Sequence, residues 1–158
     1  DQALRSEWRV VGSEKPVLMD GRLTAVRNKR VTLEIGNASL KNYTIELDVM
    51  TRNKEGDLTI YFTPTLALEI SPLLFNPSYL RWKEFVDNQW TIISDQRSDL
   101  LNNMDTFERL SIKRNGSSYE IYKDGVLMHT MVYGSEDGYP VKIQIFQNDI
   151  FIDRLVIR

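Results

Sequence analysis

The stretch from Phe107 to Tyr133 constrains the fold most, because it has the pattern of three strands joined by two tight turns. Apolar residues such as Leu110 and Ile112 alternate with polar ones, and this period of two is typical of strands with one buried face. The dipeptides Asn115-Gly116 and Asp124-Gly125 supply the positive φ angles that short hairpins need. The stretch therefore predicts an antiparallel meander.

Similar strand and turn patterns recur along the rest of the chain, and no segment shows a sustained helical period. Asp20-Gly21, Glu55-Gly56-Asp57 and Asp137-Gly138 are further turn signals, and the polar segment Ser98–Asp105 predicts at most one helical turn. Further strands are predicted at Trp8–Val11, Arg30–Ile35, Tyr43–Met50, Leu58–Phe62, Leu66–Ile70, Tyr79–Phe85, Gln89–Ser94, Val141–Phe146 and Ile150–Ile157. This spacing predicts an all-β fold, a two-sheet antiparallel β-sandwich of the jelly-roll type.

The length of 158 residues fits a single domain over the whole chain, since domains run to roughly 100–200 residues. A chain of this size buries about two thirds of its unfolded surface, so it needs no metal or disulfide to fold. Cysteine is absent, which excludes disulfides, thiolate zinc sites and cysteine nucleophiles. The N-terminal DQALRSEW lacks the basic start and apolar core of a signal peptide. Because the first residue is Asp and not Met, we expect a segment excised from a larger protein.

The formal net charge is −2, too close to neutral to attract nucleic acid or an anionic membrane over long range. Basic residues such as Arg109, Lys113 and Lys123 are scattered among acidic ones, which is typical of a solvated surface. No run of about 18 apolar residues exists, so no membrane insertion is expected.

The hairpin predicted over Tyr79–Ser94 carries the candidate binding residues. With a two-residue turn at Asp87-Asn88, Phe85 lies opposite Trp90 and Trp82 lies opposite Ile93. One face then carries Leu80, Trp82 and Ile93 as core, and the other carries Tyr79, Arg81, Lys83, Phe85, Trp90 and Ile92. A mixed aromatic and cationic face suits sugar rings or a protein partner. The alternative is that Phe85 and Trp90 cover the second sheet, and a bulge would exchange the two faces.

The order of these patterns resembles the concanavalin A-like (laminin G-like) jelly-roll superfamily, nearest to bacterial modules of the 3-keto-disaccharide hydrolase type. The resemblance rests on an early Trp, NYTIELDVMTR followed by a glycine turn and LTIYF, RLSIKRNGSSYEIYKDGVLMH, and the closing string Ile152–Ile157. It implies an extracellular or cell-surface location and a glycan or surface protein as partner. Only some members of the superfamily are hydrolases.

Glu46 and Asp48 form the candidate catalytic pair. They match part of the strand motif Glu-x-Asp-x-x-Glu of laminarinase-type jelly-roll glycosidases, but Thr51 occupies the third acidic position. A retaining glycosidase needs two carboxyl groups about 5–5.5 Å apart, and threonine cannot replace the acid. Strand alternation alone predicts Glu46 and Asp48 on a solvated face, which is the reading we prefer.

His129 and Asp153 are the remaining candidates. His129 is the only histidine and no Gly-x-Ser-x-Gly elbow accompanies it, so we expect a structural or surface role on a strand face shared with Leu127 and Met131. Related jelly rolls hold a structural calcium with terminal acidic residues, which makes Asp153 a candidate ligand. The preferred reading is a hydrogen-bonded or exposed aspartate, with no cofactor and no metal.

Three hypotheses follow. The first is a non-catalytic module that binds carbohydrate through Tyr79, Arg81, Phe85 and Trp90. The second is a structural or protein-interaction domain of a larger surface or signalling protein. The third is a glycoside hydrolase that acts through Glu46 and Asp48.

Overall fold

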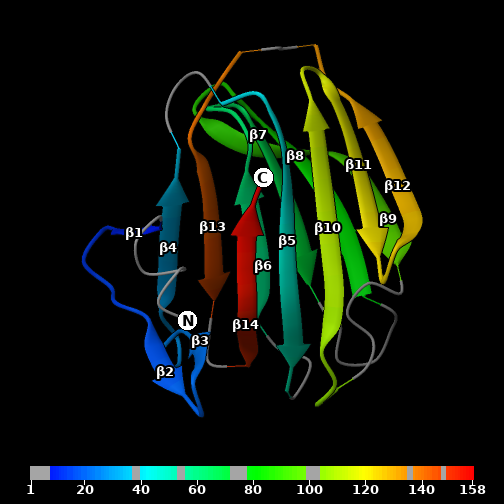
Figure 1. Cartoon of the computed structure of the whole chain (residues 1–158). Coiled ribbons are helices and arrows are strands. Elements are labelled where there is room, and N and C mark those ends of the chain that lie inside the picture. The colour runs from blue at the N-terminus through cyan, green and yellow to red at the C-terminus, as the bar shows by residue number, and fades with distance from the viewer. Residues whose placement is uncertain are drawn as a thin grey trace.

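The computed structural model describes residues 8–36, 40–52, 56–71, 78–98, 104–134, 137–146 and 149–158. Two antiparallel sheets lie face to face (Figure 1), and every regular element within these ranges is a strand. The prediction of an all-β sandwich with two antiparallel sheets is confirmed. No helix in the described ranges has the length and apolar character needed to cross a membrane.

Over the described residues each sheet contains seven strands, and their order in space differs from the order in the chain. Sheet A, at the back of Figure 1, consists of β1 (Arg9–Val11), β4 (Arg30–Ile35), β13 (Val141–Phe146), β6 (Asp57–Tyr61), β7 (Leu66–Ser71), β8 (Ser78–Val86) and β9 (Gln89–Ser98), in that order. Sheet B consists of β12 (Val126–Val132), β11 (Ser118–Lys123), β10 (Glu108–Asn115), β5 (Asn42–Thr51), β14 (Ile150–Ile157), β3 (Arg22–Thr24) and β2 (Val17–Met19).

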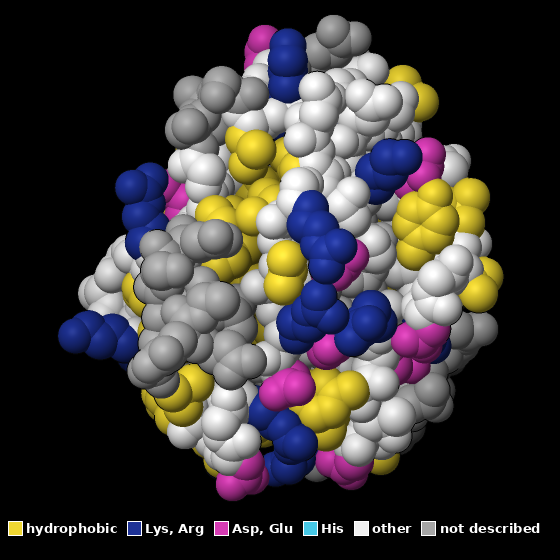
Figure 2. Space-filling model, viewed as in Figure 1, with side chains coloured by type: hydrophobic (Ala, Val, Ile, Leu, Met, Phe, Trp, Pro, Cys, Tyr) yellow, Lys and Arg dark blue, Asp and Glu magenta, His cyan; other side chains and the backbone are white. Residues whose placement is uncertain are grey.

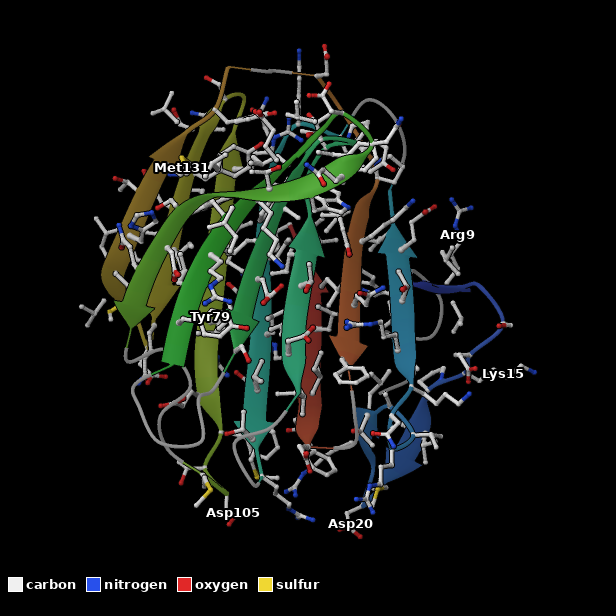
Figure 3. All side chains as sticks on the ribbon, turned by 180° about the vertical axis from the view of Figure 1, so that it is seen from behind. Arg9, Lys15, Asp20, Tyr79, Asp105 and Met131 are labelled. Carbon is white, nitrogen blue, oxygen red and sulfur yellow. The ribbon has the colours of Figure 1, made fainter. Side chains whose placement is uncertain are left out.

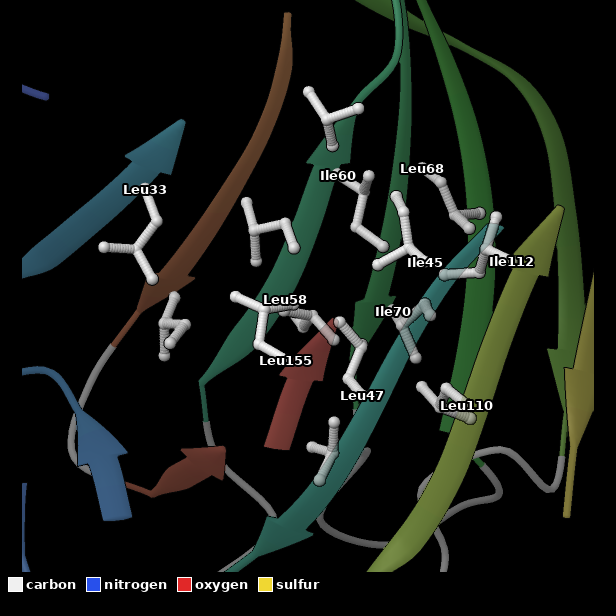
Figure 4. Close-up of a cluster of buried hydrophobic side chains, with 14 of the residues drawn as sticks. Leu33, Ile45, Leu47, Leu58, Ile60, Leu68, Ile70, Leu110, Ile112 and Leu155 are labelled. Atoms are coloured by element: carbon white, nitrogen blue, oxygen red, sulfur yellow. The ribbon is translucent and has the colours of Figure 1, made fainter. Parts of the chain in front are cut away.

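The hydrophobic core fills the space between the two sheets. Along β5, Ile45, Leu47 and Val49 are buried while Glu46 and Asp48 point to the outside. Strands of sheet A show the same alternation, and their inward leucines and isoleucines meet those of β5, β10 and β14 (Figure 4). Successive side chains of a strand point to opposite faces, so burial of one set fixes the other set on the outer face.

Most predicted strands agree with the structure to within a few residues. No strand range was predicted for either β2 (Val17–Met19) or β3 (Arg22–Thr24). The turn between β10 and β11 is also shifted by one residue from the prediction, because Asn115 pairs with Ser118 and the loop residues are Gly116 and Ser117. Gly116 has a φ of 58°, whereas Asn115 is an ordinary strand residue. Residues 99–103 of the predicted polar connection lie outside the described residues.

A bulge in the β8–β9 hairpin changes the predicted pairing. Phe85 pairs with Trp90 as predicted, but Lys83 pairs with Ile92 and Trp82 pairs with Ser94, which leaves Ile93 as an extra residue. The prediction that Ile93 faces Trp82 in the core is wrong, since Ile93 is 45% exposed. The bulge absorbs one residue of β9, so the aromatic residues before it keep their predicted face.

A second bulge lies in β12, the edge strand of sheet B. Ile121 pairs with His129 and Tyr122 pairs with Leu127, so Met128 is the extra residue. Ile121 is buried and Tyr122 lies on the outer face. The prediction that Leu127 shares a face with His129 is therefore wrong.

Arg114 is a buried cation that joins the two sheets at one end. Its guanidinium donates to the backbone carbonyls of Gly116 (3.0 Å), Phe62 (2.9 Å) and Asp137. Phe62 directly follows a strand of sheet A, so the contact connects the two layers. The ring of Tyr119 lies beside Arg114, and burial raises the pKa of the Tyr119 hydroxyl to about 12.

The substitution Leu47→Ala tests the position of the core. Leu47 is 0% exposed between the sheets, so its truncation leaves a cavity, and we expect the free energy of unfolding to fall by about 3 kcal/mol in urea denaturation. Leu127→Ala is the matched control, because Leu127 is 50% exposed, and its effect should stay within about 0.5 kcal/mol. Equal effects of the two substitutions would contradict the assignment of the core.

Candidate functional site

The outer face of sheet A carries side chains suited to binding. Burial of Val31 and Leu33 directs Thr32 outward on β4, and burial of Ile143 and Ile145 directs Gln144 outward on β13. Tyr61, at the end of β6, follows buried Ile60 and points the same way. Because β4, β13 and β6 are neighbours in the sheet, these polar groups meet.

The tip of the β8–β9 hairpin curls over this face. Asp87 and Asn88 form its two-residue turn, with φ angles of 52° and 62°. Trp90 and Tyr61 are three strand positions apart, about 14 Å in a flat sheet, yet their ring centroids are 5.6 Å apart. The Phe85 amide also donates to the carbonyl of Thr65 at 2.9 Å. Figure 3 shows the hairpin arching across the sheet, which makes the outer face concave.

A hollow of about 340 Å³ opens between the hairpin tip and the sheet. It contains an aromatic wall, a floor of neutral polar groups and one cation. The lining residues are Val11, Thr32, Tyr61, Thr63, Pro64, Trp90, Tyr139, Lys142 and Gln144. We name it the sheet A hollow.

The aromatic wall is formed by Trp90, with Phe85 behind it. Their ring centroids are 5.4 Å apart. Trp90 is 38% exposed, whereas the other two tryptophans, Trp8 and Trp82, are buried. An exposed indole held by other rings offers an apolar surface at little entropic cost.

The floor is a hydrogen-bonded row that crosses three strands. Gln144 donates from Nε2 to Oγ1 of Thr32 at 3.1 Å, and the Tyr61 hydroxyl donates to Oε1 of Gln144 at 3.4 Å. Burial raises the pKa of Tyr61, so its hydroxyl stays neutral at physiological pH. The row can exchange hydrogen bonds with hydroxyl groups of a ligand.

Tyr79 and Arg81 form a separate cluster on the same face. The Tyr79 hydroxyl donates to Oε1 of Glu69 at 2.7 Å, and Lys83 pairs with the other oxygen of Glu69. The Arg81 guanidinium lies 3.8 Å above the Tyr79 ring and pairs with Asp95 at 3.2 Å. The label in Figure 3 shows Tyr79 well away from the hairpin tip.

The structure thus places the four predicted residues on one face but in two groups. Phe85 lies six positions after Tyr79 along β8, which corresponds to about 20 Å. Phe85 and Trp90 belong to the sheet A hollow, and Tyr79 and Arg81 belong to the second cluster. No single sugar ring can contact both groups.

Sequence reasoning missed the floor of the hollow, which consists of Thr32, Tyr61 and Gln144, and it also missed the lining residues Tyr139 and Lys142. Alternation within each strand indicates that Thr32 and Gln144 point outward. It does not indicate that β4 and β13, separated by about 100 residues of chain, lie side by side.

Glu46 and Asp48 lie on the outer face of sheet B, on the other side of the molecule. Asp48 accepts two hydrogen bonds from Arg109, at 2.7 and 2.9 Å. Glu46 pairs with Arg154 at 3.4 Å and with Arg158 at 3.6 Å. Figure 2 shows basic and acidic groups interspersed over this face. Thr51, the residue in the third motif position, is buried, so the preferred solvated-face reading of Glu46 and Asp48 fits the structure.

His129 lies on the inner side of β12 and not beside a serine nucleophile. Its ring centroid is 6.4 Å from that of buried Trp82, and its Nε2 is buried without a hydrogen-bond partner. Burial lowers the pKa of His129, which favours a neutral ring. This environment fits the structural role expected for this histidine.

Asp153 is exposed at a bulge in β14, between Ile152 and Arg154. Within the described ranges no group of three or more His, Cys, Asp or Glu side chains could hold a metal ion. The preferred reading of Asp153 without a metal and the alternative of a calcium ligand both stay untested.

Comparison with known proteins identifies the fold. No protein-family model and no curated protein sequence matches the chain. Among solved structures, the carbohydrate-binding module CBM66 from Bacillus subtilis superposes with a TM-score of 0.71 at 9% identity, covering 96% of this chain and 95% of that one. The VIP36 exoplasmic/lumenal domain in its Ca²⁺/Man-bound form gives 0.67 at 12% identity, covering 96% and 82%. The Emp47p carbohydrate recognition domain gives 0.69 at 10% identity, covering 96% and 88%. The fold is therefore the concanavalin A-like jelly roll.

The substitution Glu46→Gln tests whether the acidic pair on sheet B is catalytic. Both carboxylates are neutralised by arginines, so we expect no release of reducing sugar from β-glucans by either the unmodified chain or the variant. Turnover by the unmodified chain that disappears in Glu46→Gln would establish catalysis at this pair and contradict the prediction.

Proposed function

We propose that the chain is a non-catalytic carbohydrate-binding module whose binding face is the outer face of sheet A. The observation that carries the proposal is the concave site in which exposed Trp90 stands over a hydrogen-bonding floor. A sugar ring presents an apolar face and a rim of hydroxyls, and Trp90 and the floor match these two features. The structural neighbours named as carbohydrate-binding and carbohydrate-recognition domains support the proposal.

In this proposal one extended binding face has the sheet A hollow, with Phe85 and Trp90, at one end. The second cluster, with Tyr79 and Arg81, lies at its other end. A ligand that contacts both groups spans about 20 Å, which requires an oligosaccharide chain. The expected affinity is micromolar to millimolar, because the site is shallow and each hydroxyl contact contributes only about 1 kcal/mol. We propose an extracellular or cell-surface location on the same basis.

A second candidate function, a protein-interaction domain, is favoured by the apolar edge strands. On β12, Val126, Leu127 and Val132 are exposed, the last by 74%, and the strand contains no Asp, Glu, Lys or Arg. Long apolar edges are sites where other chains pair with a sheet. Glycan binding through the sheet A hollow and protein binding through β12 use different surfaces and can be separated by mutation.

The substitution Trp90→Ala tests the proposed function. A glycan array first identifies a ligand, which is then titrated against the tryptophan fluorescence of the unmodified chain. Because Trp90 is the exposed tryptophan, we expect the titration to change the emission, and Trp90→Ala to weaken binding about tenfold or more in calorimetry.

Tyr122→Ala is the matched control, since Tyr122 is an aromatic residue on the outer face of sheet B and contacts Glu120 there. Its affinity for the ligand should be unchanged. Binding that is indifferent to Trp90→Ala would place the site elsewhere, and an array without any bound glycan would favour the protein-interaction alternative.

A further inference from the structure

The charged groups around the sheet A hollow are not balanced. None of its nine lining residues is an aspartate or a glutamate, and Lys142 is the one cation among them. Two carboxylates lie next to cations at the edge of the hollow, Glu34 beside Lys142 and Asp57 beside Arg30. The Glu69 carboxylate also acts electrostatically on Tyr61, and it is paired with Lys83. Counting Lys83 and also Arg9, which pairs with Glu34, these groups comprise four cations and three anions.

Glu34 and Asp57 each already have an arginine partner. Arg9 donates from Nε (2.9 Å) and from Nη2 to Oε1 of Glu34. Arg30 donates from Nη1 to Oδ1 of Asp57 at 3.4 Å, and the same atom lies 3.4 Å from Oε1 of Gln144. The surplus positive charge therefore belongs to Lys142.

Lys142 is held in place but is only loosely paired. Its Nζ is 3.8 Å from Oε2 of Glu34, which is beyond hydrogen-bond distance, and it lies 5.3 Å from the centroid of the Tyr139 ring. Its side chain is 29% exposed, so the ammonium is partly removed from water yet accessible from the hollow. A partly desolvated cation attracts an anion more strongly than a fully hydrated lysine does.

We propose that the sheet A hollow selects a glycan that carries a carboxylate, a sugar of the uronic-acid class, with Lys142 pairing with the carboxylate and Trp90 packing against the sugar. This inference rests on the proposed function and names its ligand class. The hollow of about 340 Å³ lies near the small end of the range of about 300–1,000 Å³ for ligand sites, so it holds a short segment of the chain. The neutral floor, which consists of Thr32, Tyr61 and Gln144, then forms hydrogen bonds with the hydroxyl groups of the sugar ring.

Matched pairs of oligosaccharides test the inference. Galacturonic, glucuronic and mannuronic acid oligomers are titrated by calorimetry beside their methyl esters, which have the same rings without the charge. We expect the acidic member of at least one pair to bind about tenfold more tightly than its ester, since hydrogen bonds to charged groups are the stronger class. The difference should shrink as sodium chloride is raised, because salt screens the pair.

Three variants test whether the preference for the acidic sugar comes from Lys142. Lys142→Gln should remove the preference, so that the acid and its ester bind equally, whereas Lys142→Arg should retain the preference for the acid. Lys113→Gln is the control for lost charge, because Lys113 is exposed on β10 in sheet B, and it should behave as the unmodified chain. Circular dichroism and thermal unfolding of all three variants verify that they fold.

The outcomes separate this inference from the proposed function. Equal binding of acid and ester, or a preference that survives Lys142→Gln, overturns the inference and leaves carbohydrate binding standing. Failure of every sugar to bind overturns both. If a polyglutamate peptide competes as well as the uronic acid at equal carboxylate concentration, the hollow is not selective for a glycan and the inference is overturned.

Discussion

The alternation of side chains along each strand is the constraint on which the rest of the molecule depends. Once Val31, Leu33, Ile60 and Ile143 are buried between the sheets, their neighbours must face outward. Thr32, Tyr61 and Gln144 are such neighbours, so the floor of the hollow is a direct consequence of the way the core is packed. A shift of one residue in the register of any of these strands would bury the floor and expose the core.

The two outer faces use this constraint differently. On sheet B the outward residues of β5, β10 and β14 neutralise one another, as Asp48 does with Arg109 and Glu46 does with Arg154. On sheet A the hairpin curls over and brings Trp90 to Tyr61. On the outer face of sheet B these charged side chains therefore form ion pairs with one another. The outer face of sheet A instead combines an exposed aromatic ring with hydrogen-bonding groups in a concave site. The proposed carbohydrate-binding function rests on the second arrangement.

The sequence was sufficient to predict most of the strands, the fold class and the pairing of Phe85 with Trp90, because these depend on local alternation and on turn dipeptides such as Asp87-Asn88. It was not sufficient to predict the face on which Ile93 lies, since no turn residue in the sequence marks a bulge at the edge of a sheet. The sheet A hollow also could not be predicted from the sequence. Its floor joins β4, β13 and β6, and the pairing of strands so distant in sequence is decided by the whole fold and not by any local pattern.

Mapping a bound oligosaccharide by amide chemical-shift perturbation in ¹⁵N-labelled protein tests most directly whether the outer face of sheet A is the functional surface. The account predicts shifts concentrated around Thr32, Tyr61, Trp90 and Gln144, with the amides on the outer face of sheet B unchanged. Shifts centred on β5 and β10, around Asp48 and Ser111, would contradict it.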